Sequence, residues 1–336
     1  MVNIGVIGCG HWGPNHIRVF NSLSDANVKT IADLDDARLS MVGENFPGIT
    51  QTKNHLDIVN DSEIEAVVVV TPTKTHYKIV KQCLEAGKHV FCEKPLCVDT
   101  NEGEELVKLA ESKCLTLMVG HIFLFNAGIL KLKSLMEENV LGDIHYLKAV
   151  RTNLGPVRQD VNSVYDLATH DISIFNFLMG SLPTEVSAMG TSVLKEGNED
   201  LAFISLKYPN NVLANIHVSW LDPKKVREIT VVGNEKMVTW DDLGELGPIT
   251  IYDKGVVKQE YVHDYGEFQL LAREGDITIP KVKRAEPLKN QDQFFLDCIR
   301  NKADCHSDGK VGNDIVKVLQ AIDKSMAGNG VPVSIA

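Results

Sequence analysis

The stretch Ile4-Gly5-Val6-Ile7-Gly8-Cys9-Gly10-His11-Trp12-Gly13 decides the fold of this chain. A short apolar run, typical of a buried strand, leads directly into a turn with the spacing GxGxxG, and residues 15–23 follow with the pattern of a helix. In such a turn the first glycine permits the tight bend, the second lets a pyrophosphate approach the backbone, and the third lets helix and strand pack closely. Because helix N-termini bind phosphate, the stretch predicts a dinucleotide-binding loop made of Gly8, Gly10, His11, Trp12 and Gly13.

A second strand supports this interpretation. Residues 28–32 form an apolar run that ends on Asp33, at the distance from Gly13 that a dinucleotide-binding unit requires. An acidic residue there accepts hydrogen bonds from the adenosine ribose, and its charge repels a 2′-phosphate. Because the nearest base is Arg38, the sequence favours NAD over NADP. The alternative is a glycine turn in an α/β protein that binds no nucleotide.

Strands and helices then alternate up to about residue 121. The expected strands are residues 66–70, 89–92 and 115–119, and the expected helices are residues 36–45, 75–86 and 100–112. Nearly unbroken apolar strands separated by helices are typical of a parallel sheet covered on both faces, so residues 1–121 are predicted to form a Rossmann domain. Thr71 and Pro72 follow one strand and are expected to border the nicotinamide ribose or ring. His76, in the next helix, is either a further cofactor contact or a capped or solvated residue.

The run His89-Val90-Phe91-Cys92-Glu93-Lys94-Pro95 stops abruptly at an acid, a base and a proline. Pro95 ends the strand because proline lacks the N–H group that a central strand needs. Lys94 is therefore expected at the carboxyl end of a parallel strand, the edge at which open sheets bind ligands. The alternative is a surface lysine paired to Glu93, since most lysines are solvated. We expect Glu93 to hold Lys94 or the local backbone rather than to react.

Residues 122–336 have a different pattern. A helix is expected over residues 127–138, and strands rich in β-branched residues follow at residues 144–151, 201–208, 212–219, 227–232, 236–240 and 249–252. Hairpin-like turns join several of them, which predicts a second α/β domain with a mostly antiparallel open sheet. Two late helices, residues 291–301 and 311–327, are candidates to pack back on the first domain. Residues 265–288 look like a long irregular segment.

A dense group of polar residues lies within residues 155–171. Asn162 or Ser163 is a good N-cap for a helix that runs to about residue 179. On that helix Asp166 and His170 stand four residues apart, hence side by side. A carboxylate beside an imidazole is what a general base needs, because the acid orients the ring and stabilises the imidazolium. A helix-surface ion pair is the equally simple alternative.

Four polar residues are candidates for substrate contacts. Arg158 precedes the helix in a loop, where its planar fork could bind a carboxylate or phosphate, although a solvated loop arginine is as simple an explanation. Asn162, Asn126 and His121 complete this group of candidates.

Composition excludes several classes of function. The 336 residues carry a formal net charge of −11 and no basic tract, which argues against nucleic acid as the main partner. Seven cysteines form no CxxC pair and no dense framework, so neither a zinc site nor a disulfide scaffold is predicted, and reduced thiols in the cytoplasm are expected. The scattered histidines offer no metal-ligand set. No apolar stretch is long enough to span a membrane, and the first residues show no signal-peptide pattern.

Taken together, residues 8–13, Glu93-Lys94-Pro95, and Asp166 with His170 resemble the glucose-fructose oxidoreductase and inositol dehydrogenase family, often called Gfo/Idh/MocA, over nearly the whole chain. The resemblance implies a Rossmann domain followed by an α/β domain whose open sheet commonly mediates oligomers, here a dimer or a tetramer. It also implies NAD(P)-dependent hydride transfer at a sugar or polyol carbinol. On that resemblance Lys94, Asp166 and His170 match the family's lysine, aspartate and histidine, which makes them the catalytic candidates.

One departure from the family pattern points to a branch. The usual aspartate three residues after the histidine is Ser173 here, and the acid is Asp171. With Gly155-Pro156-Val157-Arg158, this variant looks like the bacterial enzymes that oxidise C3 of UDP-N-acetylglucosaminuronic acid for surface-polysaccharide biosynthesis. The resemblance then implies a substrate hydroxyl between Lys94 and His170. An inositol, polyol or free-sugar dehydrogenase of the same family is one alternative. A non-catalytic NAD-binding sensor is another, although a sensor has no need for the three catalytic candidates together.

Overall fold

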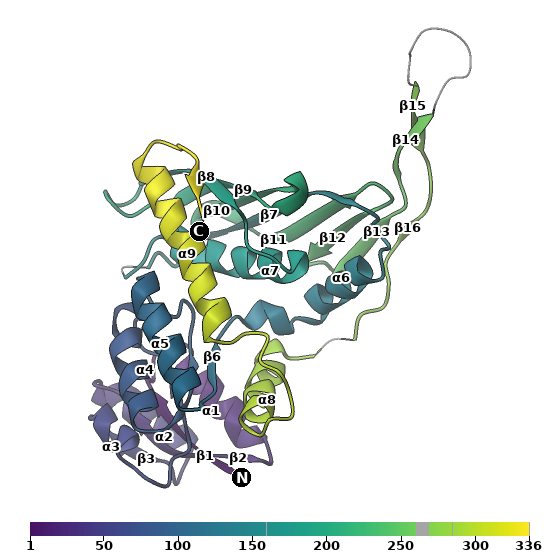
Figure 1. The fold of residues 1–336 in the computed structure, drawn as a ribbon. Helices are drawn as coiled ribbons and strands as arrows, with labels where there is room; N and C mark the ends of the chain where they lie inside the picture. The colour runs from purple at the N-terminus through teal and green to yellow at the C-terminus, as the bar shows by residue number, and fades with distance from the viewer. Residues whose placement is uncertain (159, 260–268, 284, 336) are drawn as a thin grey trace. The chain divides into compact units, whose positions relative to one another are not determined.

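The computed structural model describes residues 1–158, 160–259, 269–283 and 285–335. They divide into two compact units, shown in Figure 1, and each is described by itself. Unit 1 comprises Met1–Phe125 with Ala285–Gln320, and unit 2 comprises Asn126–Arg284 with Ala321–Ala336. The chain therefore leaves unit 1 after residue 125 rather than 121, and residues 285–320 belong to unit 1 although they follow unit 2 in the sequence.

Unit 1 is built on a six-stranded sheet in the order β3-β2-β1-β4-β5-β6, and every neighbouring pair in it is parallel. The strands are β1 Val2–Ile7, β2 Ala26–Ala32, β3 Thr50–Thr52, β4 Ala66–Val69, β5 His89–Cys92 and β6 Leu117–Val119. This confirms the predicted Rossmann sheet. Strand β3 was not predicted, because its three residues are polar and carry no apolar run.

Several helices of unit 1 begin where the sequence offers a cap or a proline. The Asp35 carboxylate accepts hydrogen bonds from the backbone of α2, and Asp99 does the same for α5. The helical segments are α1 Gly13–Ser22, α2 Asp36–Asn45, α3 His55–Val59, η1 Thr73–Thr75, α4 His76–Glu85, α5 Thr100–Ser112, η2 Ile122–Phe125 and α8 Pro287–Ile299. Helix α9, Gly309–Ala327, begins in unit 1 and ends in unit 2.

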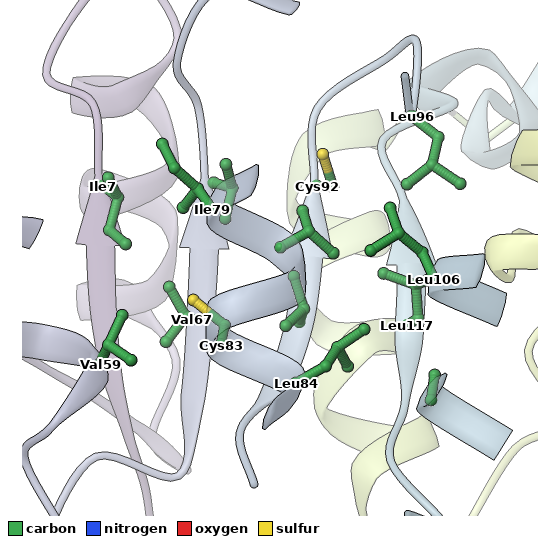
Figure 2. Packing of buried hydrophobic residues seen from close by; sticks show 14 of the residues in the cluster. Ile7, Val59, Val67, Ile79, Cys83, Leu84, Cys92, Leu96, Leu106 and Leu117 are labelled. Carbon is green, nitrogen blue, oxygen red and sulfur yellow. The ribbon is translucent and has the colours of Figure 1, made fainter. Parts of the chain in front are cut away.

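The core of unit 1 lies between the sheet and helices α4 and α5. Figure 2 shows Val67 of β4 and Cys92 of β5 directed toward the helices, which contribute Cys83, Leu84 and Leu106. These side chains are fully buried, and each stabilises the fold by about 1.5–3 kcal/mol relative to exposure. Strand ends at the carboxyl edge of the sheet are therefore held by a rigid core directly beneath them.

Unit 2 contains a nine-stranded sheet in the order β16-β13-β12-β11-β7-β10-β9-β8-β17. Among the described strand pairs of this nine-stranded sheet, only β7 and β10 are parallel, which confirms the predicted, mostly antiparallel sheet. The strands are β7 Ile144–Leu154, β8 Glu185–Thr191, β9 Leu201–Lys207, β10 Leu213–Ser219, β11 Leu221–Gly233, β12 Met237–Asp241, β13 Ile249–Tyr252, β16 Ile277–Thr278 and β17 Val333–Ser334. Strands β14 Gly255–Gln259 and β15 Gln269–Arg273 form a separate hairpin.

Two predictions about irregular structure need correction. The helix expected from Asn162 or Ser163 to Met179 begins as a π-helical turn, η3 Val164–Ala168, and continues as α7 Thr169–Met179. A wider turn of this kind occurs often at functional sites. The long irregular segment expected over residues 265–288 is wrong for the described residues, which contain β15, β16 and the start of α8; residues 265–268 and 284 lie outside them.

The remaining segments are α6 Ala127–Glu137 and η4 Pro209–Asn211. All seven cysteines are free thiols, and five of them are buried. Within the residues that the structure describes, every helix is too short or too polar to cross a membrane.

Candidate cofactor and active site

The glycine turn has the geometry that its sequence predicts. Gly8 has φ +107°, and a Cβ atom there would lie 2.4 Å from the Val70 carbonyl oxygen. A Cβ on Gly13 would lie 2.1 Å from the carbonyl oxygen of Gly8. Gly10 differs, because the nearest atom to its Cβ position is Arg38 Nη1 at 3.8 Å. Two glycines are therefore required by the protein's own packing, whereas Gly10 leaves open space.

A dinucleotide fits this cradle. Gly10, with open space beside it, lies in the turn that leads into α1. Helix α1 begins without a side-chain cap or an acidic residue in its first turn. Its first N–H groups are thus not taken by a carboxylate of the helix and suit the pyrophosphate of NAD. His11 and Trp12 are exposed in the loop, with their rings in edge contact at 5.8 Å.

Asp33 stands directly after β2 and is bonded to the glycine turn. Its Oδ2 accepts a hydrogen bond from the backbone N–H of Cys9 at 2.7 Å, and its Oδ1 accepts one from the N–H of Asp35 at 2.9 Å. Arg38 Nη1 lies 3.9 Å from the same carboxylate. The carboxylate is therefore fixed in orientation, as a residue that binds ribose hydroxyls needs to be.

The ends of β4 and β5 are tied together by His76. Its two ring nitrogens lie 2.8 Å from the carbonyl oxygens of Thr71 and Pro95, and the side chain is buried. His76 is thus not a solvated residue, and both of its ring nitrogens are engaged by the backbone. A contact between His76 and the cofactor stays a prediction. Thr71 is half-buried and Pro72 is exposed, so both remain candidates to border the nicotinamide.

Lys94 lies at the carboxyl edge of the parallel sheet. Strand β5 ends at Cys92, and the N–H of Glu93 still donates to the carbonyl oxygen of Val69 in β4. The Glu93 carboxylate accepts a hydrogen bond from the backbone N–H of Lys94 at 3.2 Å, as expected of a residue that holds the local backbone. Lys94 itself is half-buried rather than fully solvated.

His121 follows β6 at the same sheet edge. It is 1% exposed, and within the described residues neither ring nitrogen has a hydrogen-bond partner. Burial lowers the pKa of His121 to about 3, so the ring is neutral near pH 7. A buried imidazole whose nitrogens are unsatisfied suits a bound polar group, and His121 stays a candidate contact.

Asp166 in unit 2 is held by one residue that is distant in the sequence and by one nearby residue. Trp220 Nε1 donates to its Oδ2 at 3.3 Å, and Arg158 Nη1 donates to its Oδ1 at 3.3 Å. The Arg158 fork also binds Asp160, with bonds of 3.0 and 2.6 Å. Arg158 is therefore not a solvated loop arginine, and a substrate carboxylate would have to replace Asp160 on its fork.

Two asparagines proposed as substrate contacts have structural roles. The Oδ1 of Asn126 accepts from Gly128 N at the start of α6 and from Trp240 Nε1, and its Nδ2 donates to Asp242. Asn162 Oδ1 accepts from the N–H of Tyr165 at 3.1 Å, so Asn162 rather than Ser163 caps the helical segment.

The Nδ2 of Asn162 donates to Glu199 at 2.8 Å. Each of the two amides thus uses both of its ends within the protein. A substrate contact by Asn126 or Asn162 stays a prediction, and it would have to share or replace one of these hydrogen bonds.

His170 lies in the first turn of α7 and is half-buried. The next residue, Asp171, forms a bidentate ion pair with Arg151 of β7 at 2.9 and 2.7 Å, and both side chains are at most 3% exposed. The Ser173 hydroxyl donates to the carbonyl oxygen of His170 at 2.7 Å. The two positions that depart from the family pattern thus fix α7 against the sheet and shape the backbone at His170.

Sequence reasoning missed the partners of the candidates. Trp220 and Asp160 hold Asp166 and Arg158, while His16 of α1 and Asp292 of α8 extend the hydrogen bonds of Glu93. Asp160 lies within the polar group of residues 155–171, which was a usable signal. The other three gave none, because they come together only through the tertiary fold.

Comparisons with known proteins agree with this geometry. Residues 2–121 match the family described as "Oxidoreductase family, NAD-binding Rossmann fold", and residues 129–239 match the "GFO/IDH/MocA C-terminal domain". An inositol 2-dehydrogenase 2 from Paenarthrobacter aurescens is 30% identical over 228 residues, which cover 65% of this chain and 68% of that protein. A UDP-N-acetylglucosamine 3-dehydrogenase from Acidithiobacillus ferrooxidans is 27% identical over 75% of this chain and 77% of its own length.

The fold is also that of solved structures. The WlbA dehydrogenase from Bordetella pertussis, in complex with NADH and UDP-GlcNAcA, superposes with a TM-score of 0.81 at 20% identity and covers 100% of this chain and 99% of that one. At this identity the likeness concerns the fold alone. This chain spans only 65% and 61% of the length of two curated relatives, which are described as uncharacterized oxidoreductases from Bacillus subtilis and Streptococcus pneumoniae.

Proposed function

This chain belongs to the Gfo/Idh/MocA family of oxidoreductases, and from that premise we propose that it is an NAD-dependent dehydrogenase that oxidises a sugar or polyol hydroxyl to a ketone. The observation that carries the proposal is the position of Lys94. It is the second residue after β5, at the carboxyl edge of the sheet whose first turn is an open dinucleotide cradle. In sheets of this type that edge is where ligands bind.

Each catalytic candidate has a distinct role. When bound, NAD accepts the hydride that leaves the carbinol carbon. His170 takes the proton of the hydroxyl group, and Asp166 stabilises the resulting imidazolium. Lys94 carries the positive charge that stabilises the developing alkoxide. The hydrogen bonds from Trp220 and Arg158 keep the Asp166 carboxylate in one orientation during this transfer.

We propose UDP-N-acetylglucosaminuronic acid, oxidised at C3, as the substrate. Similarity to the Acidithiobacillus UDP-N-acetylglucosamine 3-dehydrogenase supports a UDP-sugar. The Arg158 fork, already bound to carboxylates of the protein, supports an acidic substrate that exchanges with Asp160. The inositol 2-dehydrogenase relative, which is 30% identical, favours a second candidate, a cyclic polyol.

One experiment separates these substrates. The protein is incubated with NAD and, in turn, UDP-N-acetylglucosaminuronic acid, UDP-N-acetylglucosamine and myo-inositol, and the absorbance of the reduced cofactor is followed. Turnover on the acidic UDP-sugar alone is expected, whereas turnover on inositol alone would assign the polyol. NAD binding without turnover on any of them would favour the non-catalytic sensor.

Lys94→Ala tests the proposed chemistry. We expect kcat to fall by roughly 10²- to 10⁴-fold while the dissociation constant of NAD changes little, because the lysine acts on the reacting hydroxyl. Lys78→Ala, which removes an exposed lysine of α4, is the matched control and should keep full turnover. Full turnover of Lys94→Ala would contradict the assignment.

We also propose that the open face of the unit 2 sheet joins copies of this chain in a cytoplasmic dimer or tetramer. Alternate residues of β9 are buried, and those between them face outward; Phe203 is 53% exposed there, and Leu213 of β10 is 58% exposed. The Phe203 ring stacks on His217 of the neighbouring strand at 4.4 Å. Light scattering after size exclusion tests the proposal, and a monomer at micromolar concentration would contradict it.

A further inference from the structure

Three charged side chains meet inside unit 1, in what we call the buried charge network of Glu93, His16 and Asp292. His16, on α1, is fully buried, and its Nε2 lies 3.1 Å from Glu93 Oε1 at the end of β5. Its Nδ1 lies 3.0 and 3.1 Å from the two carboxylate oxygens of Asp292 on α8. Asp292 is also fully buried, and the Glu93 side chain is 12% exposed. One imidazole thus bridges two carboxylates from distant parts of the sequence.

With both carboxylates ionised, the donors and acceptors require a charged ring. An ionised carboxylate only accepts hydrogen bonds, and an imidazole donates from both nitrogens only when it is protonated. An imidazolium between two carboxylates satisfies all three groups with charge-assisted bonds. Burial alone would lower the pKa of His16, but the Asp292 and Glu93 carboxylates outweigh it and raise the pKa to about 10. The other close neighbours, Phe20 and Phe91, are aromatic and uncharged.

The network ends at the backbone of Lys94. The Glu93 oxygen that does not contact His16 accepts the hydrogen bond from Lys94 N at 3.2 Å. Gly120 of the neighbouring strand end leaves room for the carboxylate, because a Cβ there would lie 2.9 Å from Glu93 Oε1. The Glu93 carboxylate is therefore confined on three sides. Its position determines where the chain turns from β5 into Lys94.

We infer that His16, bridging Glu93 and Asp292, is a positioning residue that holds Lys94 in the geometry needed for hydride transfer. The inference rests on the proposed catalytic role of Lys94. A buried ionic group is weak evidence of a role in stability, because well-packed apolar residues often stabilise a protein as much. The buried charge network lies at the end of β5 that carries Lys94, and this location points instead to a role in the candidate active site. Displacing a catalytic group by about 1 Å can cost roughly 100-fold in rate.

The other end of β5 supplies a matched control. Lys88 immediately precedes the strand, is 6% exposed, and donates to the carbonyl oxygens of Asp61 and Ile64 at 2.6 and 2.7 Å. Lys88→Met therefore removes a buried charge and its hydrogen bonds from the same strand without touching the Lys94 end. A purely structural defect should affect both ends alike.

The test compares His16→Gln and Asp292→Asn with Lys88→Met in the full-length protein. We expect the first two variants to lower kcat by roughly 10- to 100-fold, with NAD binding, measured by fluorescence titration, changed less than about threefold. Lys88→Met should lower the melting temperature but keep kcat within about twofold of the wild type. Full kcat in Asp292→Asn, the milder change, together with a lower melting temperature, would overturn the inference.

A measurement on the wild type covers the case in which the variants do not fold. In ¹⁵N NMR of histidine-labelled protein, the His16 ring should keep both nitrogens protonated at pH 8, where an ordinary histidine is neutral. A neutral His16 ring at that pH would overturn the inference. If Lys94→Ala keeps turnover, the proposed function fails; if Lys94→Ala is inactive while His16→Gln and Asp292→Asn are fully active, only this inference fails.

Discussion

The two units hold their candidate residues in different ways. In unit 1 the cofactor cradle consists of backbone at strand ends, where Gly8 and Gly13 satisfy packing demands within a few residues of each other. In unit 2 the Asp166 carboxylate depends on Trp220, which lies between β10 and β11, 54 residues away in the sequence. Binding of a dinucleotide thus depends on local turn geometry, whereas placement of the carboxylate proposed to stabilise the imidazolium depends on tertiary contacts.

The difference predicts how the candidate residues of each unit respond to mutation. A backbone cradle tolerates side-chain changes around it but not a Cβ atom inside it. A cluster of side chains tolerates small backbone shifts but loses function when one partner is removed. Pairs of substitutions can separate these two modes.

The glycines of the turn should give the largest effect. Gly8→Ala places a methyl group 2.4 Å from the Val70 carbonyl oxygen at a φ of +107°, and we expect it to cost more than about 5 kcal/mol of folding free energy. Gly10→Ala meets no protein atom closer than 3.8 Å, so its melting temperature should stay near that of the wild type. Its methyl group should instead weaken NAD binding by at least about tenfold.

Calorimetric melting and NAD titration measure both variants. Equal melting temperatures for Gly8→Ala and Gly10→Ala would contradict the assignment of Gly8 to protein packing and of Gly10 to the approach of the ligand. Normal NAD affinity in Gly10→Ala would place the pyrophosphate elsewhere.

A second, smaller effect is the pH dependence of stability, to which two buried histidines of unit 1 contribute with opposite sign. The carboxylates around His16 raise its pKa to about 10, against about 6.5 in an unfolded chain. Its stabilisation is therefore complete below about pH 6.5 and is lost as the pH rises toward 10, by up to about 5 kcal/mol. Burial lowers the pKa of His121 to about 3. Between about pH 6.5 and pH 3, only the unfolded chain binds a proton at this histidine, so His121 lowers the free energy of unfolding as the solution becomes acidic.

Urea unfolding between pH 5 and pH 10 checks this balance. The stability difference between wild type and His16→Gln should be largest at low pH and should shrink above about pH 7. A difference that is constant over this range would show that the His16 proton is not retained by the folded state.

Much of unit 1 could be predicted from the sequence because its signals are local. The strand before Gly8, the acid after β2, and the stop at Pro95 each report on a few neighbouring residues, and the parallel sheet follows from their alternation. Strands β7 and β9 to β13 of unit 2 were predicted for the same reason, since alternation within β9, for example, separates its buried residues from its exposed ones. The other strands of unit 2 were not predicted.

Side-chain partners were not predictable in this way. His16 and Asp292 are 276 residues apart, and nothing in either neighbourhood marks them as a pair. The tertiary fold also assigned Asn126 and Asn162 to helix caps, although polar residues near a predicted site are natural ligand candidates. Residue type predicts what a side chain can bind, and only the fold shows which partner is within reach.

The smallest predicted effect tests that reassignment. Asn126→Ala removes the cap of α6 and should lower the free energy of unfolding by about 1 kcal/mol. Asp35→Ala removes the corresponding cap of α2 and is the control, with a similar loss. Because the Asn126 amide is engaged by Gly128, Trp240 and Asp242, the KM for the sugar should be unchanged in both variants. A rise in KM confined to Asn126→Ala would return this residue to the substrate contacts. The Asn126 side chain would then both bind the substrate and cap α6.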